Sequence, residues 1–266
     1  MAVENGGIKL KSRNLNACVL ALTLCNAAED PYLDAVATRP SFILIISDDA
    51  GYVDYGFMGS KEIRTPSLDK LAKQGIRFLH AYAGPTCSPS RCGLLSGHYS
   101  QRHGFGRNCG ARFDEPNDGF PKDVKTLPAL LKAHGYVTGM AGKWHVGYKN
   151  PEHVNPPEAD NAPWNRGFDY VTIHDSGMSH FYNFSEVGAE WNLWRGIDNR
   201  YQQKMESDKE PHFIEQMDPD TYMTDYLTDE TCAFIRRNKS EPWFFYLSYN
   251  APHTPMVPKK GKMEKL

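Results

Sequence analysis

Short apolar runs alternate with amphipathic helical patterns along this chain of 266 residues, and the alternation restricts the folds open to it. The stretch from Ser41 to Ser47 is continuously apolar at its centre, as expected of a strand buried on both faces of a sheet. Leucines at helical spacing follow between Thr65 and Gly75. Strands that alternate with helices are typical of an α/β domain, so we expect a mostly parallel sheet sandwiched by helices.

Local start and stop signals place the remaining elements. Threonine or proline at the start of a helix and glycine at its end mark the expected boundaries. On this basis further helices are expected at 88–96, 126–134 and 220–238, and further strands at 76–81, 136–141 and 243–247. Between Tyr148 and Asp220 the pattern breaks down, and the prolines and aromatics there predict long loops.

Polar side chains follow the expected strands at the points where they end. The pair Asp48 and Asp49 follows the first strand, Lys143 and His145 follow the strand at 136–141, and His253 follows the last. A loop that carries Cys87 comes after the strand expected at 76–81. The carboxyl ends of parallel strands gather at one edge of a sheet, where ligands bind, so these groups are expected to converge on one rim.

The run Cys87-Ser88-Pro89-Ser90-Arg91-Cys92-Gly93-Leu94-Leu95-Ser96-Gly97 sets a thiol at the start of the helix expected at 88–96. Free backbone N–H groups and the positive end of the helix dipole favour an anion there. Arg91 lies one turn further on the same face, and its guanidinium can donate two hydrogen bonds to a tetrahedral oxyanion. A structural cysteine beside a surface arginine is the alternative interpretation.

The same run resembles the signature of the sulfatase family, C-x-P-S-R followed by x-x-L-L-[ST]-G. Two later segments also resemble the family's motifs, in the family's order: Gly142-Lys143-Trp144-His145, and Pro252-His253-Thr254-Pro255. The resemblance implies an alkaline-phosphatase-like α/β fold. It also implies that a maturation enzyme converts Cys87 to Cα-formylglycine (3-oxoalanine), whose hydrate is the nucleophile that hydrolyses sulfate monoesters.

The resemblance further implies a role for each site residue. Asp48, Asp49 and residue 87 would bind a divalent metal, Ca²⁺ or in its place Mg²⁺, which accords with the preference of hard cations for oxygen ligands. Arg91 and Lys143 would stabilise negative charge on the sulfuryl group. His253 would protonate the leaving alcohol, and His145 would take a proton from residue 87 so that sulfate is released.

The resemblance covers about Ser41 to Pro255. It implies a sulfatase catalytic domain over 39–266 that is incomplete at its C-terminus, because no second Asp-Asn pair of metal ligands follows His253. With half of its protein ligands missing, a cation is expected to bind weakly, and little activity is expected from these residues alone. The sheet is also expected to have an exposed edge.

Two other functions remain open on the sequence. A hydrolase of the same superfamily could act on phosphate or phosphonate esters, and a non-catalytic homologue could bind sulfated glycans through Arg91, Lys143 and the aromatic loops. The substrate is expected to be a sulfated small molecule or a sulfated carbohydrate. Aromatic side chains between Trp164 and Trp194 could stack on sugar rings, although local packing explains such residues as well.

Composition and the N-terminus bear on location and partners. The formal net charge of −2 creates no field that favours nucleic acid or an anionic membrane, and no apolar run is long enough to span a bilayer. Basic residues, an apolar stretch and Ala27 follow in the order of a signal peptide over 1–27, which predicts a secreted or periplasmic protein. Cys92 and Cys109 could form a disulfide or remain free thiols.

Overall fold

The computed structural model of this chain describes residues 39–109, 119–147, 161–174, 181, 193–197, 212–213 and 221–262. The signal peptide expected over 1–27 lies outside these residues. Among the described residues, no helix combines the length and the apolar character that crossing a bilayer would need.

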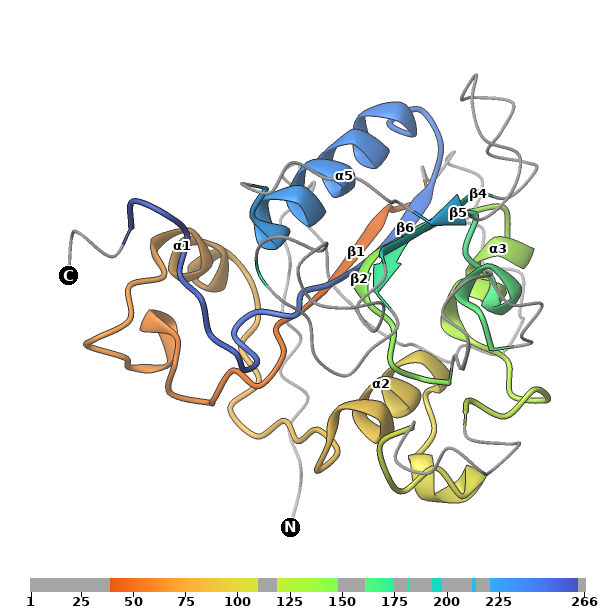
Figure 1. Ribbon diagram of the computed structural model, residues 1–266, viewed down its shortest axis with the longest axis horizontal. Helices are drawn as coiled ribbons and strands as arrows, with labels where there is room; N and C mark the ends of the chain where they lie inside the picture. The colour runs from red at the N-terminus through yellow and green to blue at the C-terminus, as the bar shows by residue number, and fades with distance from the viewer. Residues whose placement is uncertain are drawn as a thin grey trace, which may run out of the picture.

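Six strands form one sheet in the order β1-β6-β2-β3-β4-β5 (Figure 1). The strands are β1 (Phe42–Ile46), β2 (Val137–Lys143), β3 (Tyr170–His174), β4 (Leu193–Ile197), β5 (His212–Phe213) and β6 (Trp243–Ser248). Strands β1, β6, β2 and β3 run parallel to one another. Strand β4 pairs antiparallel with β3, and β5 pairs antiparallel with β4. The expected mostly parallel sheet is therefore confirmed, with an antiparallel extension at one side.

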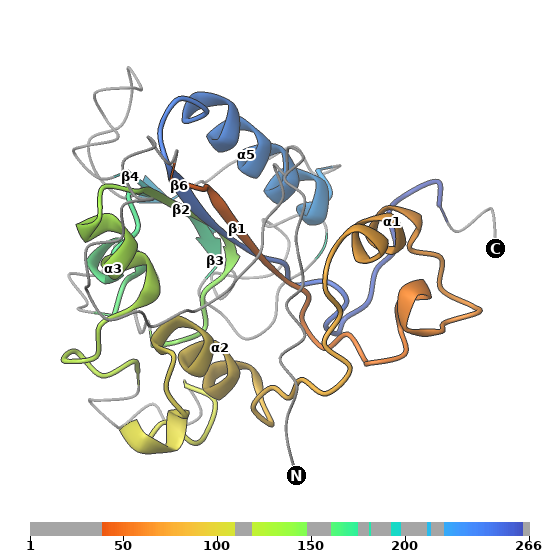
Figure 2. The same cartoon turned by 180° about the vertical axis from the view of Figure 1, so that it is seen from behind.

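Helices cover both faces of the sheet, as expected (Figures 1 and 2). Helices α2 (Cys87–Ser96) and α3 (Leu127–Ala133) pack on one face, and α5 (Met223–Arg237) packs on the other. The first face buries Cys92 and Leu95 of α2 against the alternate strand residues Phe244 and Tyr246. The second face buries apolar residues of α5 and strands together, among them Met223, Leu227, Phe234, Phe245 and Leu247. Strands β2 and β6 have apolar layers on both sides.

Helix ends lie close to where the capping residues placed them. The Thr126 side chain accepts a hydrogen bond from the backbone N–H of Ala129 and caps α3. Helix α2 ends at Gly97, whose φ of 70° is the left-handed conformation that glycine adopts without strain. The helix expected at 220–238 is α5, three residues shorter at its start.

Two predictions near the N-terminal side of the sheet are wrong. The strand expected at 76–81 is irregular backbone, and its apolar side chains are exposed, with Ile76 at 70% and Phe78 at 71%. The stretch that forms β1 was expected to be buried on both faces, but its Ile45 is 52% exposed. In the described sheet β1 pairs only with β6 and is an edge strand. An apolar run signals burial but does not show which strand would pair with it.

The same side of the molecule carries a lobe that stands apart from the sheet in both views (Figures 1 and 2). It contains the 3₁₀ turn η1 (Gly56–Met58) and helix α1 (Pro66–Gln74), whose leucines at helical spacing, Leu68 and Leu71, are exposed. Two further 3₁₀ turns, η2 (Ser100–His103) and η3 (Pro163–Arg166), lie in connections elsewhere. Between Tyr148 and Asp220, where loops were expected, the chain instead forms β3, β4 and β5.

Candidate active site

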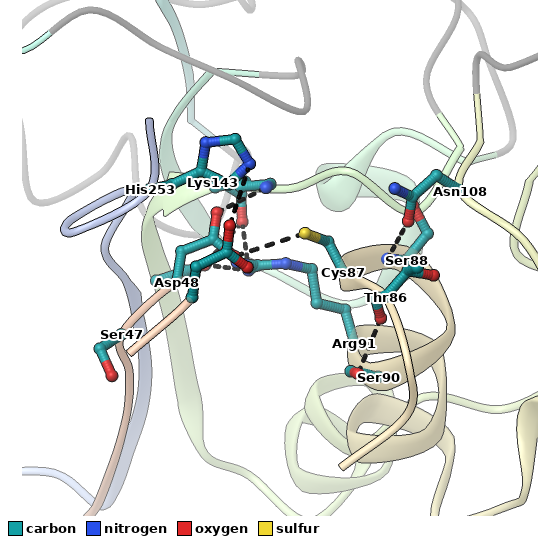
Figure 3. Close-up of polar contacts among 12 residues, drawn as sticks. Ser47, Asp48, Thr86, Cys87, Ser88, Ser90, Arg91, Asn108, Lys143 and His253 are labelled. Atoms are coloured by element: carbon teal, nitrogen blue, oxygen red, sulfur yellow. Dashed lines mark hydrogen bonds and ion pairs between the residues drawn. The ribbon is translucent and has the colours of Figure 1, made fainter. Parts of the chain in front are cut away.

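The site forms where β1, β6 and β2, which are neighbours in the sheet, end beside the first turn of α2 (Figure 3). Asp48 lies two residues beyond β1, and its backbone N–H donates to the carbonyl of Ala251 at 2.9 Å. Lys143 is the last residue of β2, and Cys87 is the first of α2. The predicted convergence at the carboxyl ends of the strands is therefore observed, although no strand leads directly to Cys87.

Asp48 lies between two cationic side chains. Lys143 Nζ lies 2.5 Å from Asp48 Oδ2, and Arg91 Nη2 lies 3.4 Å from Asp48 Oδ1. All three side chains are buried, and that of Lys143 is completely inaccessible to solvent. Burial by itself raises the pKa of Asp48, but the charges of Lys143 and Arg91 outweigh it, and the pKa is lowered overall. Asp48 is therefore a carboxylate at neutral pH.

Cys87 points its thiol toward the same carboxylate, with Sγ 3.5 Å from Asp48 Oδ1. Burial raises the pKa of this thiol, and although Lys143 opposes the effect, the carboxylate of Asp48 adds to it. The unmodified cysteine is therefore less ionised at neutral pH than an ordinary cysteine, and since the thiolate is the nucleophilic form, it is a weak nucleophile.

Arg91 extends from α2 alongside Cys87 to Asp48 (Figure 3). Its Nη1 donates to the carbonyl of Lys143 and to the Tyr246 hydroxyl, both at 3.1 Å, and to Ser248 Oγ. Burial lowers the pKa of Arg91, but Tyr246 and Asp48 favour the charged form more strongly, and the net pKa is raised. The guanidinium thus stays charged although it is only 2% exposed.

The start of α2 is less open to an anion than the sequence suggested. The backbone N–H of Ser88 donates to Asn108 Oδ1 at 3.0 Å, and that of Ser90 donates to the carbonyl of Thr86. Residue 89 is proline and has no N–H. At these positions, charged side chains rather than free backbone donors provide the attraction for an anion.

His253 and Asp49 form the outer rim of the site. His253 Nε2 lies 3.4 Å from Asp49 Oδ2, and the Asp49 side chain is 58% exposed. His253 Nδ1 lies 2.7 Å from the carbonyl of Thr254, which can only accept, so Nδ1 carries a hydrogen. Nε2 is therefore the ring nitrogen that faces Asp49.

His145 lies two residues beyond the end of β2 and is 8% exposed. Burial, together with the positive charges of Lys143 and Arg91, lowers its pKa to about 3. Its Nδ1 is buried without a hydrogen-bond partner in the described part of the chain, and its backbone φ is 50°. His145 is therefore a neutral imidazole at ordinary pH, able to accept a proton but not to donate one as an imidazolium.

Three potential metal ligands come together in the described residues. Ligand atoms of Asp48, Cys87 and His253 lie within 4.8 Å of one another. A carboxylate oxygen suits a hard divalent cation, and so would an oxygen in place of the Cys87 sulfur. Asp49, the other expected ligand, does not join this group and instead contacts His253. The donor set therefore fits a cation through Asp48 and residue 87, with Asp49 at the rim.

Sequence reasoning missed three residues of this site: Asn108, Tyr246 and Ser248. The two β6 residues could have been found from strand periodicity, because Phe244, Tyr246 and Ser248 alternate onto the face that meets α2. Asn108 follows a turn and gives no comparable signal. The four described cysteines are all free, so the alternative of a Cys92–Cys109 disulfide is not what the structure contains.

Known proteins resemble this chain over most of its length. The family model described as Sulfatase matches residues 40–263. Mouse arylsulfatase J is 32% identical over 84% of this chain, and human N-acetylgalactosamine-6-sulfatase is 31% identical over 83% of it. The crystal structure of Ps i-CgsB in complex with k-i-k-neocarrahexaose is 34% identical and superposes with a TM-score of 0.62 over 82% of this chain.

These relatives are longer than the matched region. The chain spans 34% of arylsulfatase J, 41% of N-acetylgalactosamine-6-sulfatase and 46% of Ps i-CgsB. The family model nevertheless covers nearly all of the chain from β1 onward, including each polar residue that the structure gathers at the carboxyl ends of the strands. The chain therefore belongs to the sulfatase family.

Proposed function

We propose that the protein hydrolyses sulfate monoesters with residue 87 as the nucleophile. The observation that carries the proposal is the position of residue 87 at the start of α2, 3.5 Å from a buried carboxylate that Lys143 and Arg91 both contact. A site with this much fixed positive charge beside a nucleophile suits an anionic substrate.

The nucleophile is proposed to be the formylglycine form of residue 87 rather than the thiol. Burial raises the pKa of the thiol, and a sulfated cysteine would have no second hydroxyl to expel sulfate. In the hydrated formylglycine form, residue 87 supplies two hydroxyl oxygens on one carbon, one to attack sulfur and one whose deprotonation releases sulfate. A maturation enzyme that oxidises Cys87 is the partner this proposal requires.

Arg91 and Lys143 are proposed to stabilise the sulfuryl group as charge redistributes over its oxygens. Both cations are buried and already oriented, so they need little reorganisation when charge develops. Because they also contact Asp48, the carboxylate holds them close together against their mutual repulsion.

His253 is the proposed general acid. With Nδ1–H donating to the Thr254 carbonyl, its Nε2–H in the imidazolium form can pass to the ester oxygen as the bond between sulfur and that oxygen breaks. His145 is the proposed acceptor for the second hydroxyl proton of residue 87. Burial and the nearby cations keep it neutral, as an acceptor must be, and the same lowered pKa makes it a weak base.

A divalent cation is proposed at Asp48 and residue 87, with Asp49 as a further ligand from the rim. Ca²⁺ is the first choice, and Mg²⁺ the alternative, because oxygen ligands suit both. When bound, such a cation favours ionisation of a coordinated hydroxyl and neutralises charge on a sulfate oxygen. His253, although within the same cluster, keeps its role as acid in this proposal.

The proposed substrates are sulfate esters of carbohydrates or of small molecules. Two similar solved structures contain sugars: Ps i-CgsB with k-i-k-neocarrahexaose, and BT4656, 27% identical, with its substrate D-glucosamine-2-N,6-O-disulfate. The aromatic residues that suggested sugar stacking are in part explained otherwise, since Phe168 and Tyr170 are buried in the core. The signal-like pattern over 1–27 supports a location outside the cytoplasm.

The test is to produce the chain with and without a formylglycine-generating enzyme and to follow residue 87 and turnover together. Mass spectrometry of the peptide that contains Cys87 should show the aldehyde only after co-expression. Hydrolysis of p-nitrophenyl sulfate should rise with the aldehyde content and should be absent from Cys87→Ser. Full turnover with an intact thiol would refute the proposed nucleophile.

The alternatives are separate outcomes of the same experiment. Faster hydrolysis of p-nitrophenyl phosphate than of the sulfate would favour a phosphate or phosphonate ester hydrolase. Binding of a sulfated glycan without turnover, with Cys87 unmodified, would favour a non-catalytic homologue.

A further inference from the structure

One arm of the Arg91 guanidinium is occupied entirely by the protein. Nη1 has two hydrogens and three acceptors within reach: the Lys143 carbonyl, the Tyr246 hydroxyl and Ser248 Oγ. Nη2 is the arm that contacts Asp48. Because the guanidinium is planar, fixing Nη1 on several acceptors also fixes the direction of Nη2.

The two hydroxyls have defined roles in this arrangement. Arg91 can only donate, so the hydroxyl oxygens of Tyr246 and Ser248 must both accept from it. Ser248 Oγ then donates its own hydrogen to the Lys143 carbonyl at 2.7 Å. Tyr246 and Ser248 are fully buried, which leaves them no water to replace these partners.

The Lys143 carbonyl is the point at which three elements of the site meet. It accepts from Arg91 on α2 and from Ser248 on β6, and it belongs to the last residue of β2. The side chain of the same Lys143 contacts Asp48 after β1. The position of α2, and with it residue 87, is thus tied to the strand ends through the hydroxyls of β6.

We propose that Tyr246 and Ser248 are positioning residues that hold the guanidinium of Arg91 so that Nη2 remains at Asp48 Oδ1, the carboxylate oxygen that the Cys87 thiol also contacts. The proposal rests on the sulfatase function proposed above. Neither hydroxyl touches substrate in this scheme, since both act through Arg91. A preorganised arginine stabilises charge in the transition state without first reorganising, so loss of the hydroxyls should lower kcat more than it raises KM.

The first test needs no activity. Rotation about the Cζ–Nη bonds of Arg91, measured by ¹⁵N NMR of the arginine side chains, should be slow in the wild-type protein. In Tyr246→Phe combined with Ser248→Ala it should become fast. Tyr170→Phe is the matched control, because Tyr170 is equally buried and bonds Glu230 on the opposite face of the sheet. Fast rotation of Arg91 in the wild type, or no change in the double variant, would overturn the proposal.

The second test uses turnover of p-nitrophenyl sulfate by the matured protein. Tyr246→Phe alone is expected to lower kcat about tenfold. A tenfold change corresponds to about 1.4 kcal/mol, which is close to the contribution of one hydrogen bond to a charged group. KM should change little, and Tyr170→Phe should leave kcat unchanged. An unchanged kcat in both single variants, Tyr246→Phe and Ser248→Ala, would refute the positioning role.

The two tests separate failure of this inference from failure of the proposed function. If the matured wild-type protein lacks even the low turnover expected of this chain but the double variant frees Arg91, the positioning role stands and the function assigned to the site is wrong. If turnover is present and Arg91 rotates equally in all variants, the function stands and the positioning role is wrong.

Discussion

Replacing Asp48 with asparagine should destabilise the folded protein strongly, independently of any catalytic role. Asp48 is the carboxylate that compensates Lys143, which is completely buried, and Arg91, whose side chain is 3% exposed. Asparagine keeps the shape but removes the charge, so two buried cations lose the carboxylate that both contact. Removing one partner of a buried ion pair costs about 3–5 kcal/mol, and we expect Asp48→Asn to lower the free energy of unfolding by that amount.

The assay is urea unfolding followed by circular dichroism, in EDTA so that loss of a bound metal cannot account for the effect. Asp225→Asn is the control, because its pair with Lys259 is about half exposed and such pairs contribute about 0–1 kcal/mol. Adding Lys143→Met to Asp48→Asn should recover a large part of the loss, since it removes one uncompensated charge. A change below about 0.5 kcal/mol in Asp48→Asn would refute the electrostatic argument.

Three further predictions concern the same region. Burial alone would raise the pKa of Asp48, but Lys143 and Arg91 lower it in the folded protein. The stability that Asp48 contributes is therefore present above its unfolded pKa of about 3.9 and is lost as pH falls below that pKa. Urea unfolding from pH 6 to pH 3 should show this loss in the wild type and less of it in Asp48→Asn. Gly142→Ala would place a Cβ 1.9 Å from the Ser248 carbonyl oxygen at a φ of 100°, and should cost about 3 kcal/mol by thermal unfolding, against about 1–2 kcal/mol for Gly135→Ala, which has more room. His253→Ala should slow hydrolysis of an alkyl sulfate roughly a hundredfold but that of p-nitrophenyl sulfate much less, because p-nitrophenolate leaves without protonation; equal losses would contradict its role as acid.

The sequence predicted the elements whose signals are local. Strand β6 is an apolar run of strand length, β2 lies where a strand was expected, α3 has the expected threonine cap, and α5 buries apolar residues at helical spacing. The prediction that Asp48, Lys143 and His253 converge also held, because it follows from parallel strands having their carboxyl ends at one edge. These features depend on few assumptions about which strands are neighbours.

Features that depend on pairing could not be predicted in the same way. The sequence could not show that β1 lies at the edge of the described sheet or that the stretch at 76–81 pairs with nothing there, since burial of an apolar run requires a partner elsewhere in the chain. The contacts of Arg91 with Tyr246 and Ser248 join residues more than 150 positions apart. Only the order β6-β2 and the packing of α2 across them bring these side chains together.

The geometry divides the site into an inner part and a rim with different constraints. Asp48, Arg91 and Lys143 are buried and linked to two strands and a helix, so a substitution in any one leaves a charge or a donor without its partner. Asp49 and His253 lie on irregular backbone at the surface and contact each other only at 3.4 Å. Substitution at the rim therefore costs little stability, whereas substitution inside costs several kcal/mol. The rim residues are therefore constrained mainly by the acid and metal-binding roles proposed for them, whereas the inner residues are constrained by the fold as well.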